Sequence, residues 1–163
     1  MADFTHLDAR GEARMVDITD KQPTVRAATA SAFVRCSPAI VAALRDGSTP
    51  KGDVLAVARV AGIAAAKRTP ELLPLAHTIG VHGVVVDAEV LDSGVALRAT
   101  ARTADRTGVE MEALTAASVA ALNVIDMVKG IDKSVSIEHV RLESKTGGKS
   151  GAWYRPGLEE DEA

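Results

Sequence analysis

Two segments of the chain are predicted to form helices that are apolar on nearly every side, and this restricts the fold more than any other feature. The first covers residues 53–67, where Asp53 can cap the helix, and the second covers about 108–129. In water, such helices need to be covered on several sides. A sheet covers only one side, so the surplus apolar surface predicts a subunit interface.

Alternating residues predict the strands that would pack against these helices. Residues 95–103 alternate between apolar and polar, residues 84–90 precede them, and Asp-Ser-Gly at 92–94 indicates a hairpin turn. Residues 134–143 are a third candidate strand and 24–34 a weaker fourth. Since only 2% of the residues are aromatic, Ala, Val, Leu and Ile have to fill the core. We therefore expect an α+β domain.

Length and composition limit the classes of protein to consider. We expect a loosely ordered segment at 1–12, a single domain at 13–151 and a disordered acidic tail at 152–163. The net charge of −3 argues against a general nucleic-acid binder. The chain has a single cysteine and a polar start. Its longest apolar run, at 113–125, is shorter than the roughly 20 residues that span a bilayer. We therefore expect a cytoplasmic protein with no membrane partner.

The stretch KTGGKSG at 145–151 is similar to the end of a nucleotide-binding P-loop. Gly148, Lys149 and Ser150 fit that motif, but Glu143 stands where its first glycine belongs, and Pro156 and an acidic tail follow instead of a helix. Two interpretations remain: a flexible loop, or a loop whose lysines reach an anion without a P-loop fold.

The histidines do not predict a metal site. His6, His77, His82 and His139 are scattered, without cysteines or paired carboxylates at ligand spacing. His77 follows Pro74 on a predicted loop, where a lone histidine is more often structural than catalytic.

Charged residues mark both ends of the second helix. Glu110 and Glu112 lie in its first turn, where the helix dipole favours carboxylates, and Asp126 and Lys129 have the spacing of a surface pair. Asp126, however, interrupts an apolar run. Glu112 and Asp126 lie on nearly the same face, about 21 Å apart along the axis. If both serve one site, that site has to draw on two subunits.

Several lysines lie in predicted loops or at helix ends: Lys51, Lys67, Lys129, Lys145 and Lys149. Lysines there are usually only solvated. If they converged, they would hold a polyphosphate as point charges.

The sequence resembles one family over nearly its whole length, from about Thr5 to Gly151. The resemblance rests on these strings, which follow the family's order: THLDARGEARMVDITDK, KGDVLAVARVAGIAAAKRT, LLPLAHT, TGVEMEALTAASVAAL, IDMVKG and VRLESKTGGKSG. The family is molybdenum cofactor biosynthesis protein C, the cyclic pyranopterin monophosphate synthases.

The resemblance implies a ferredoxin-like α+β fold, with helices packed on one face of an antiparallel sheet. It implies a homohexamer, a trimer of dimers with active sites at the dimer interface. The implied reaction is that of a lyase in molybdenum cofactor (molybdopterin) biosynthesis. It converts a dihydro-GTP, cyclised between ribose C3′ and guanine C8, into cyclic pyranopterin monophosphate and diphosphate. No tightly bound cofactor is expected, and assistance by a divalent metal and a transient contact with the preceding enzyme are left open.

The resemblance also implies the site residues. The catalytic candidates are Lys51, His77, Asp126 and Lys129. The substrate-binding candidates are Leu75, Ala76, His77, Glu110, Met111, Glu112 and Lys145. By their chemistry, the lysines would neutralise the triphosphate, Asp126 and His77 would transfer protons, and Glu112 would accept from guanine N–H groups. Glu110 has two open roles, binding substrate or orienting a lysine.

Two departures from the family pattern leave a second hypothesis open. The family has Cys-His-Pro where this chain has Ala76, His77 and Thr78, and a tyrosine where this chain has Ile125. The chain could therefore be a nucleotide-binding module that has lost catalysis. Diphosphate release would separate the two hypotheses. A purely structural oligomer is disfavoured, because the charged set is complete.

Overall fold

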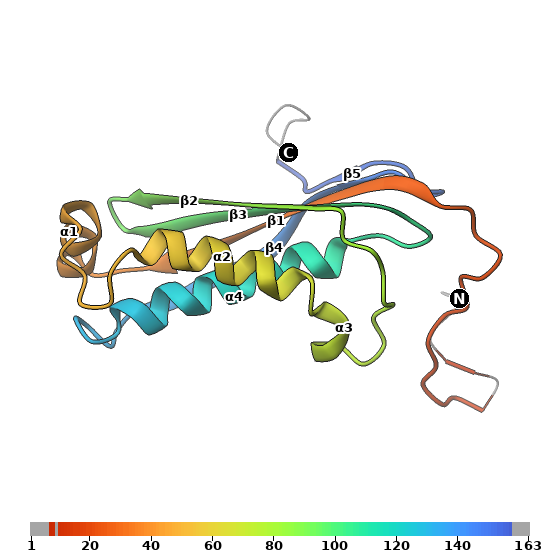
Figure 1. Ribbon diagram of the computed structural model, residues 1–163, viewed down its shortest axis with the longest axis horizontal. Helices are drawn as coiled ribbons and strands as arrows, with labels where there is room; N and C mark the ends of the chain where they lie inside the picture. The colour runs from red at the N-terminus through yellow and green to blue at the C-terminus, as the bar shows by residue number, and fades with distance from the viewer. Residues whose placement is uncertain (1–6, 9, 158–163) are drawn as a thin grey trace.

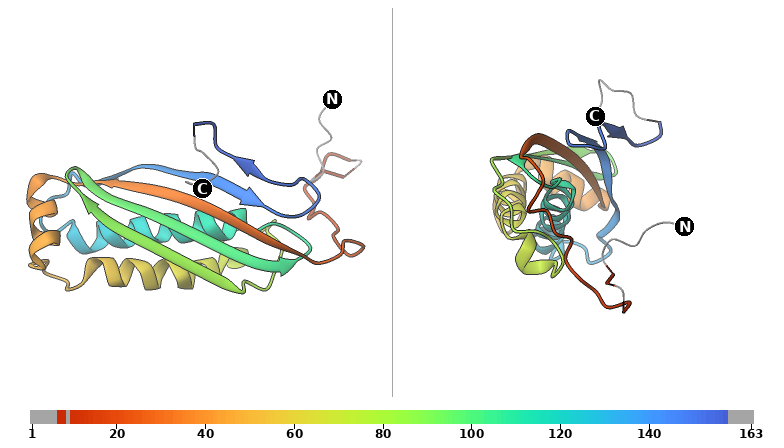
Figure 2. Two further views of the ribbon diagram at one scale, coloured as in Figure 1. Left: turned by 90° about the horizontal axis from the view of Figure 1, so that it is seen from above. Right: turned by 90° about the vertical axis from the view of Figure 1, so that its right-hand side faces the viewer.

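A five-stranded antiparallel sheet with its helices on one face forms the body of the protein, as the computed structural model shows for residues 7, 8 and 10–157 (Figures 1 and 2). The elements follow in this order: β1 (Thr24–Arg35), α1 (Pro38–Asp46), α2 (Val54–Ala66), α3 (Thr69–Leu72), β2 (Gly83–Leu91), β3 (Gly94–Asp105), α4 (Glu110–Val128), β4 (Ser136–Thr146) and β5 (Trp153–Tyr154). The strand order in the sheet is β2-β3-β1-β4-β5. Without the short β5, this is the β-α-β-β-α-β arrangement of the ferredoxin-like fold, which confirms the predicted fold class.

The predicted elements form close to their expected positions. β2 and β3 are the predicted hairpin, β1 and β4 are the two other candidate strands, and α2 and α4 are the two apolar helices. Asp53 caps α2 by accepting from the backbone N–H of Ala56. The sequence analysis did not predict α1 or α3. Both begin with a proline in the first turn, a position that suits its fixed φ.

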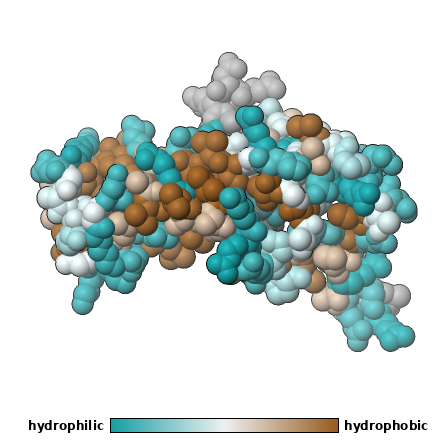
Figure 3. Space-filling view, viewed as in Figure 1, coloured by the Kyte–Doolittle hydropathy of each residue, from teal (hydrophilic) through white to brown (hydrophobic). Residues whose placement is uncertain are grey.

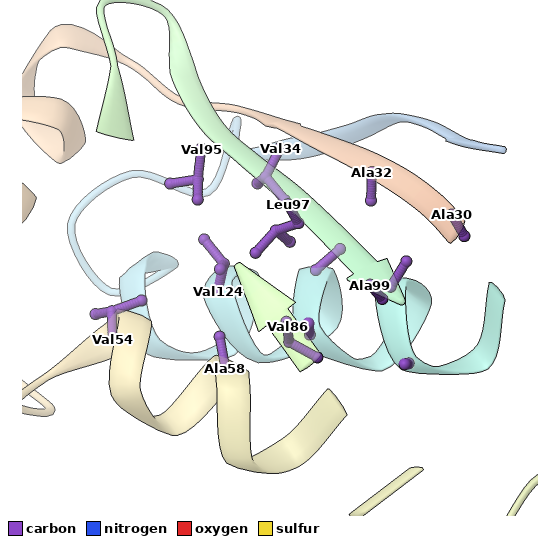
Figure 4. Packing of buried hydrophobic residues seen from close by; sticks show 14 of the residues in the cluster. Ala30, Ala32, Val34, Val54, Ala58, Val86, Val95, Leu97, Ala99 and Val124 are labelled. Carbon is purple, nitrogen blue, oxygen red and sulfur yellow. The ribbon is translucent and has the colours of Figure 1, made fainter. Parts of the chain in front are cut away.

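Small side chains let α4 lie close to both the sheet and α2. Its buried face carries five alanines, Ala113, Ala116, Ala117, Ala120 and Ala121, and the strand residues opposite include Ala30, Ala32 and Ala99 (Figure 4). A Cβ added to Gly62 of α2 would lie 2.9 Å from the carbonyl oxygen of Ala116. This close packing covers the alanine face of α4, whereas Leu122 and Met111 of the same helix stay 55% and 44% exposed.

α4 is the one helix among residues 7, 8 and 10–157 whose length and composition would suit a membrane span. In this structure it is the central core helix, packed on the sheet and on α2 (Figure 2).

The C-terminal segment differs from the predicted disordered tail at 152–163. Trp153 and Tyr154 form β5, which pairs with Lys145 and Ser144 of β4, and Arg155 donates from Nε to the carbonyl oxygen of Leu142 at 2.7 Å. This segment is ordered because the backbone of β5 and the guanidinium group of Arg155 both find partners on β4. Residues 158–163 of the expected tail, and 1–6 and 9 of the expected N-terminal segment, lie outside the described residues.

Candidate active site

A cavity of about 470 Å³ opens at the N-terminal end of α4. Met111 and Glu112 line it from the helix, and His77 from the loop after α3. The complete lining is Val16, Ile18, Lys21, Leu75, Ala76, His77, Thr107, Gly108, Glu110, Met111 and Glu112. We call this the N-terminal pocket. It brings together every predicted substrate-binding residue except Lys145.

Lys145 reaches the same region through Glu110. Its Nζ lies 3.0 Å from Glu110 Oε1, which joins the end of β4 to the first turn of α4. This contact fits the second of the two roles left open for Glu110, the orientation of a lysine.

Glu112 is the most enclosed acid of the N-terminal pocket, with only 3% of its surface exposed. Burial raises its pKa above the ordinary value, and the neighbouring charge of Glu110 adds to the increase. Glu112 therefore takes up a proton more readily than a glutamate in water would.

His77 is held by the segment that precedes the sheet. Its Nε2 lies 2.6 Å from the carbonyl oxygen of Val16. Because a carbonyl can only accept, Nε2 carries the proton and donates it. In the neutral ring, Nδ1 is then the atom left to accept a proton.

A second set of charges lies at the C-terminal end of α4, next to the loop that follows α1 (Figure 1). Asp126 accepts from Lys51 at 2.8 Å through Oδ2 and from Lys129 at 2.7 Å through Oδ1. Its pKa falls to about 2, mainly through the hydrogen bond from Lys129 and then through that from Lys51. Asp126 is thus an ionised carboxylate between two ammonium groups.

These three charges border a cavity of about 430 Å³. Its lining is Pro50, Lys51, Ile125, Asp126, Met127, Lys129, Gly130, Lys133 and Val135. We call it the C-terminal pocket.

α4 runs without interruption from Glu110 to Val128, so the two pockets lie at opposite ends of one helix. At about 1.5 Å per residue, Glu112 and Asp126 are roughly 21 Å apart along the axis. A single subunit therefore does not bring all the predicted site residues together.

The structure adds pocket residues that the sequence analysis had not chosen. Lys21 lines the N-terminal pocket with Val16 and Ile18, and Lys133 lines the C-terminal pocket. Lys21 belongs to one of the strings that carry the family resemblance, and this was the only feature of the sequence that pointed to Lys21 as a site residue. Lys67 is the C-cap of α2, and neither it nor Lys149 lines either pocket.

The departures from the family pattern fall in both pockets. Ala76 lines the N-terminal pocket and Ile125 the C-terminal pocket. In the described part of the chain, no three His, Cys, Asp or Glu residues are grouped to hold a metal ion.

Known proteins resemble this chain over nearly all of its length. A family model described as the MoaC family matches residues 15–148. A cyclic pyranopterin monophosphate synthase from Nocardioides sp. is 59% identical over 156 residues, which cover 94% of this chain and 96% of that protein. Proteins of the same name from Streptomyces avermitilis and Geobacter sulfurreducens are 59% and 54% identical, over 93% of this chain and 89% and 96% of theirs.

Proposed function

We infer that this chain, which belongs to the MoaC family, is a lyase with cyclic pyranopterin monophosphate synthase activity. Its substrate is a dihydro-GTP cyclised between ribose C3′ and guanine C8, and its products are cyclic pyranopterin monophosphate and diphosphate. This is an early step of molybdenum cofactor biosynthesis. The observation that carries the proposal is the complete charged set at the two ends of α4.

The lysines suit the triphosphate end of the substrate. Lys51 and Lys129 share Asp126, and their side chains are half exposed, so a polyanion can reach them. Fixed cations next to the phosphates would stabilise the negative charge that develops on the leaving diphosphate. Lys145, which Glu110 holds at the other pocket, supplies a third positive charge.

Asp126 and His77 are the groups for proton transfer. Asp126 is ionised in the free protein, which makes it an acceptor. A bound triphosphate would offset the charge of Lys51 and Lys129, and the pKa of Asp126 would rise towards the range where a base is effective. His77 can accept through Nδ1 while Val16 holds its ring. Glu112 lies in the N-terminal pocket, where it can accept from the guanine N–H groups.

One complete site then needs two subunits, with the N-terminal pocket of one facing the C-terminal pocket of the other. The roughly 21 Å between the two ends of α4 supports this arrangement. Exposed apolar residues support association as well, since Val57 and Val60 of α2 and Val85 of β2 are all more than two-fifths exposed. Figure 3 shows apolar residues gathered around α2 and β2. We expect a homohexamer built as a trimer of dimers.

The remaining parts of the proposal concern cofactors and location. The roles above need no tightly bound cofactor, although a divalent metal travelling with the triphosphate is compatible with them. A protein of this pathway that receives its substrate from a preceding enzyme is expected in the cytoplasm.

The experiment is an assay of diphosphate release from the purified cyclic precursor. The wild-type protein should release diphosphate and form the pterin product, and Asp126→Ala should lower turnover by at least about 100-fold. Binding of the precursor without release would favour the non-catalytic module instead, and near wild-type turnover of Asp126→Ala would remove Asp126 from the mechanism.

A further inference from the structure

Strand β4 is not regular, and its irregularity decides the direction in which Lys145 points. Against β1, Leu142 pairs with Ala30 and Ser144 pairs with Thr29, so Glu143 is an extra residue without a partner on β1. This is a β-bulge, and a second one in the same strand leaves Glu138 unpaired.

The bulge at Glu143 changes which residues share a face of the sheet. Ala28 and Ala30 both lie on the buried face towards the helices, and their partners on β4 are Lys145 and Leu142. Residues three apart lie on opposite faces of a regular strand. If Glu143 instead paired regularly with Thr29, the bulge would disappear, and Lys145 would pair with Ala27 and point away from α4 and Glu110.

A buried carboxylate and its partners hold this bulge. Glu143 is only 2% exposed, its Oε1 accepts from the Ser31 hydroxyl, and the same oxygen lies 2.6 Å from Arg141 Nε. Arg155 Nε lies 3.2 Å from Oε2, but it donates its hydrogen bond to the carbonyl oxygen of Leu142, so Oε2 has an ion-pair contact and no hydrogen bond.

The backbone on the other side of β4 holds the same residues. The backbone N–H of Arg155 donates to the carbonyl oxygen of Glu143 at 2.8 Å, and β5 pairs directly with Ser144 and Lys145 (Figure 2). The bulge is thus fixed by Ser31 and Arg141 from within the sheet and by Arg155 from its edge. Removal of one partner of a buried carboxylate is costly, because the remaining charges no longer balance one another.

We propose that Glu143 is a positioning residue for the reaction, because it fixes the bulge that turns Lys145 onto the helix face, where it meets Glu110 and the substrate. Arg155 serves the same end from β5. The inference rests on the proposed function only through the role of Lys145 in binding the triphosphate.

A double-mutant cycle on kcat/KM tests the proposal, with Lys145→Ala, Glu143→Ala and both together. Lys145→Ala should cost about 100-fold and Glu143→Ala about 10-fold, and the double variant should be no worse than Lys145→Ala alone. Glu143→Gln, which keeps the shape and the hydrogen-bonding oxygen, should recover part of the loss. If Glu143 only stabilised the fold, the two losses would multiply to about 1,000-fold, and the proposal would be wrong.

Glu138→Ala is the matched control, since Glu138 is the extra residue of the other bulge in β4 and forms an ion pair with Arg35 at 2.6 Å. Its activity should stay within about twofold of wild type. An equal loss in Glu138→Ala and Glu143→Ala would contradict the proposal.

A crystal structure of Glu143→Ala separates this inference from the proposed function. Lys145 should be found out of contact with Glu110 or in more than one position. A Lys145 still paired with Ala28 and Glu110 would overturn the inference, even if the wild-type protein proved inactive and the proposed function failed.

Discussion

At the scale of single residues, the environment gives similar side chains different chemistry. Asp126 and Glu112 are both carboxyls on α4, yet two lysines lower the pKa of Asp126 while burial raises that of Glu112. The sequence predicted the ion pair between Asp126 and Lys129 from their spacing. It did not predict the contact of Lys51 with Asp126, because their partnership depends on how α2 packs against α4.

The pKa of Asp126 can be measured by carbon NMR, and it should be about 2. A folded-state pKa below the ordinary 3.8 means that any stabilisation by the ionised group is present above about pH 4 and is lost as the pH falls towards 2. Lys129→Ala should raise the pKa of Asp126, and added salt should do so more weakly. Lys67→Ala is the control and should leave it unchanged, whereas a wild-type pKa at or above 3.8 would contradict the assignment.

Lys145 and Lys149 belong to the same seven-residue stretch but differ in their surroundings. Gly147 and Gly148 have φ of 86° and 73°, and a side chain at either would collide with Val25 or Arg26, so the chain turns sharply between the two lysines. Lys145 precedes the turn and contacts Glu110, and Lys149 follows it and is exposed.

Lys145→Ala should therefore lower kcat/KM far more than Lys149→Ala, by about 100-fold against less than about threefold. Steady-state assays of both variants, with equal concentrations of folded protein, measure the two losses in kcat/KM. The reverse order of losses would show that the wrong lysine had been chosen.

At the scale of elements, the periodicity of the sequence was sufficient for the main helices and strands but not for the details that form the site. Alternation identified β3 well, since it is regular over its length. β4 contains two bulges, which alternation does not reveal because both depend on the pairing with β1, and the one at Glu143 also lies beside β5. Strict alternation along β4 would have separated Lys145 from the face of Leu142.

Contact between α2 and α4 requires a glycine at one point. A Cβ at Gly62 would lie 2.9 Å from the carbonyl oxygen of Ala116 and 3.1 Å from Val86 Cγ2. Gly62→Ala should therefore lower the free energy of unfolding by about 1 kcal/mol, since overpacking costs roughly 1–3 kcal/mol and better helix propensity returns less than about 1 kcal/mol.

Urea unfolding measures this difference, and Gly130→Ala is the matched control, because a Cβ there would meet nothing within 4 Å. The control should be unchanged or slightly more stable. A Gly62→Ala variant that is as stable as the control would mean that α2 and α4 are less tightly packed than described.

At the scale of the whole molecule, the sequence predicted the surplus apolar surface and the separation of the charged groups. A helix apolar on nearly all sides indicated burial beyond one sheet, and the 14-residue spacing of Glu112 and Asp126 indicated two half-sites. The geometry of the proposed association could not be predicted, since it depends on the shape of surfaces built from distant segments such as α2 and β2.

Light scattering coupled to gel filtration should give a mass of six subunits, with dimers as the only smaller species. Replacement of an exposed apolar residue of α2, as in Val60→Asp, should shift this distribution towards smaller species. Lys149→Ala should not change it. A wild-type protein that stays monomeric at micromolar concentration would contradict the association expected here.

The most direct test of a site shared by two subunits is complementation between two inactive variants, one from each pocket. Lys145→Ala damages the N-terminal pocket, and Asp126→Ala damages the C-terminal pocket. Variants of Lys51 and Asp126 would be unsuitable, because both residues lie in the same pocket and could not complement one another. Mixed dimers of the first two variants contain one undamaged site, so refolding an equal mixture should restore about a quarter of wild-type diphosphate release. Restoration to that level is the predicted result. Activity no higher than the mean of the two parents, in mixed oligomers that are folded, would contradict a shared site.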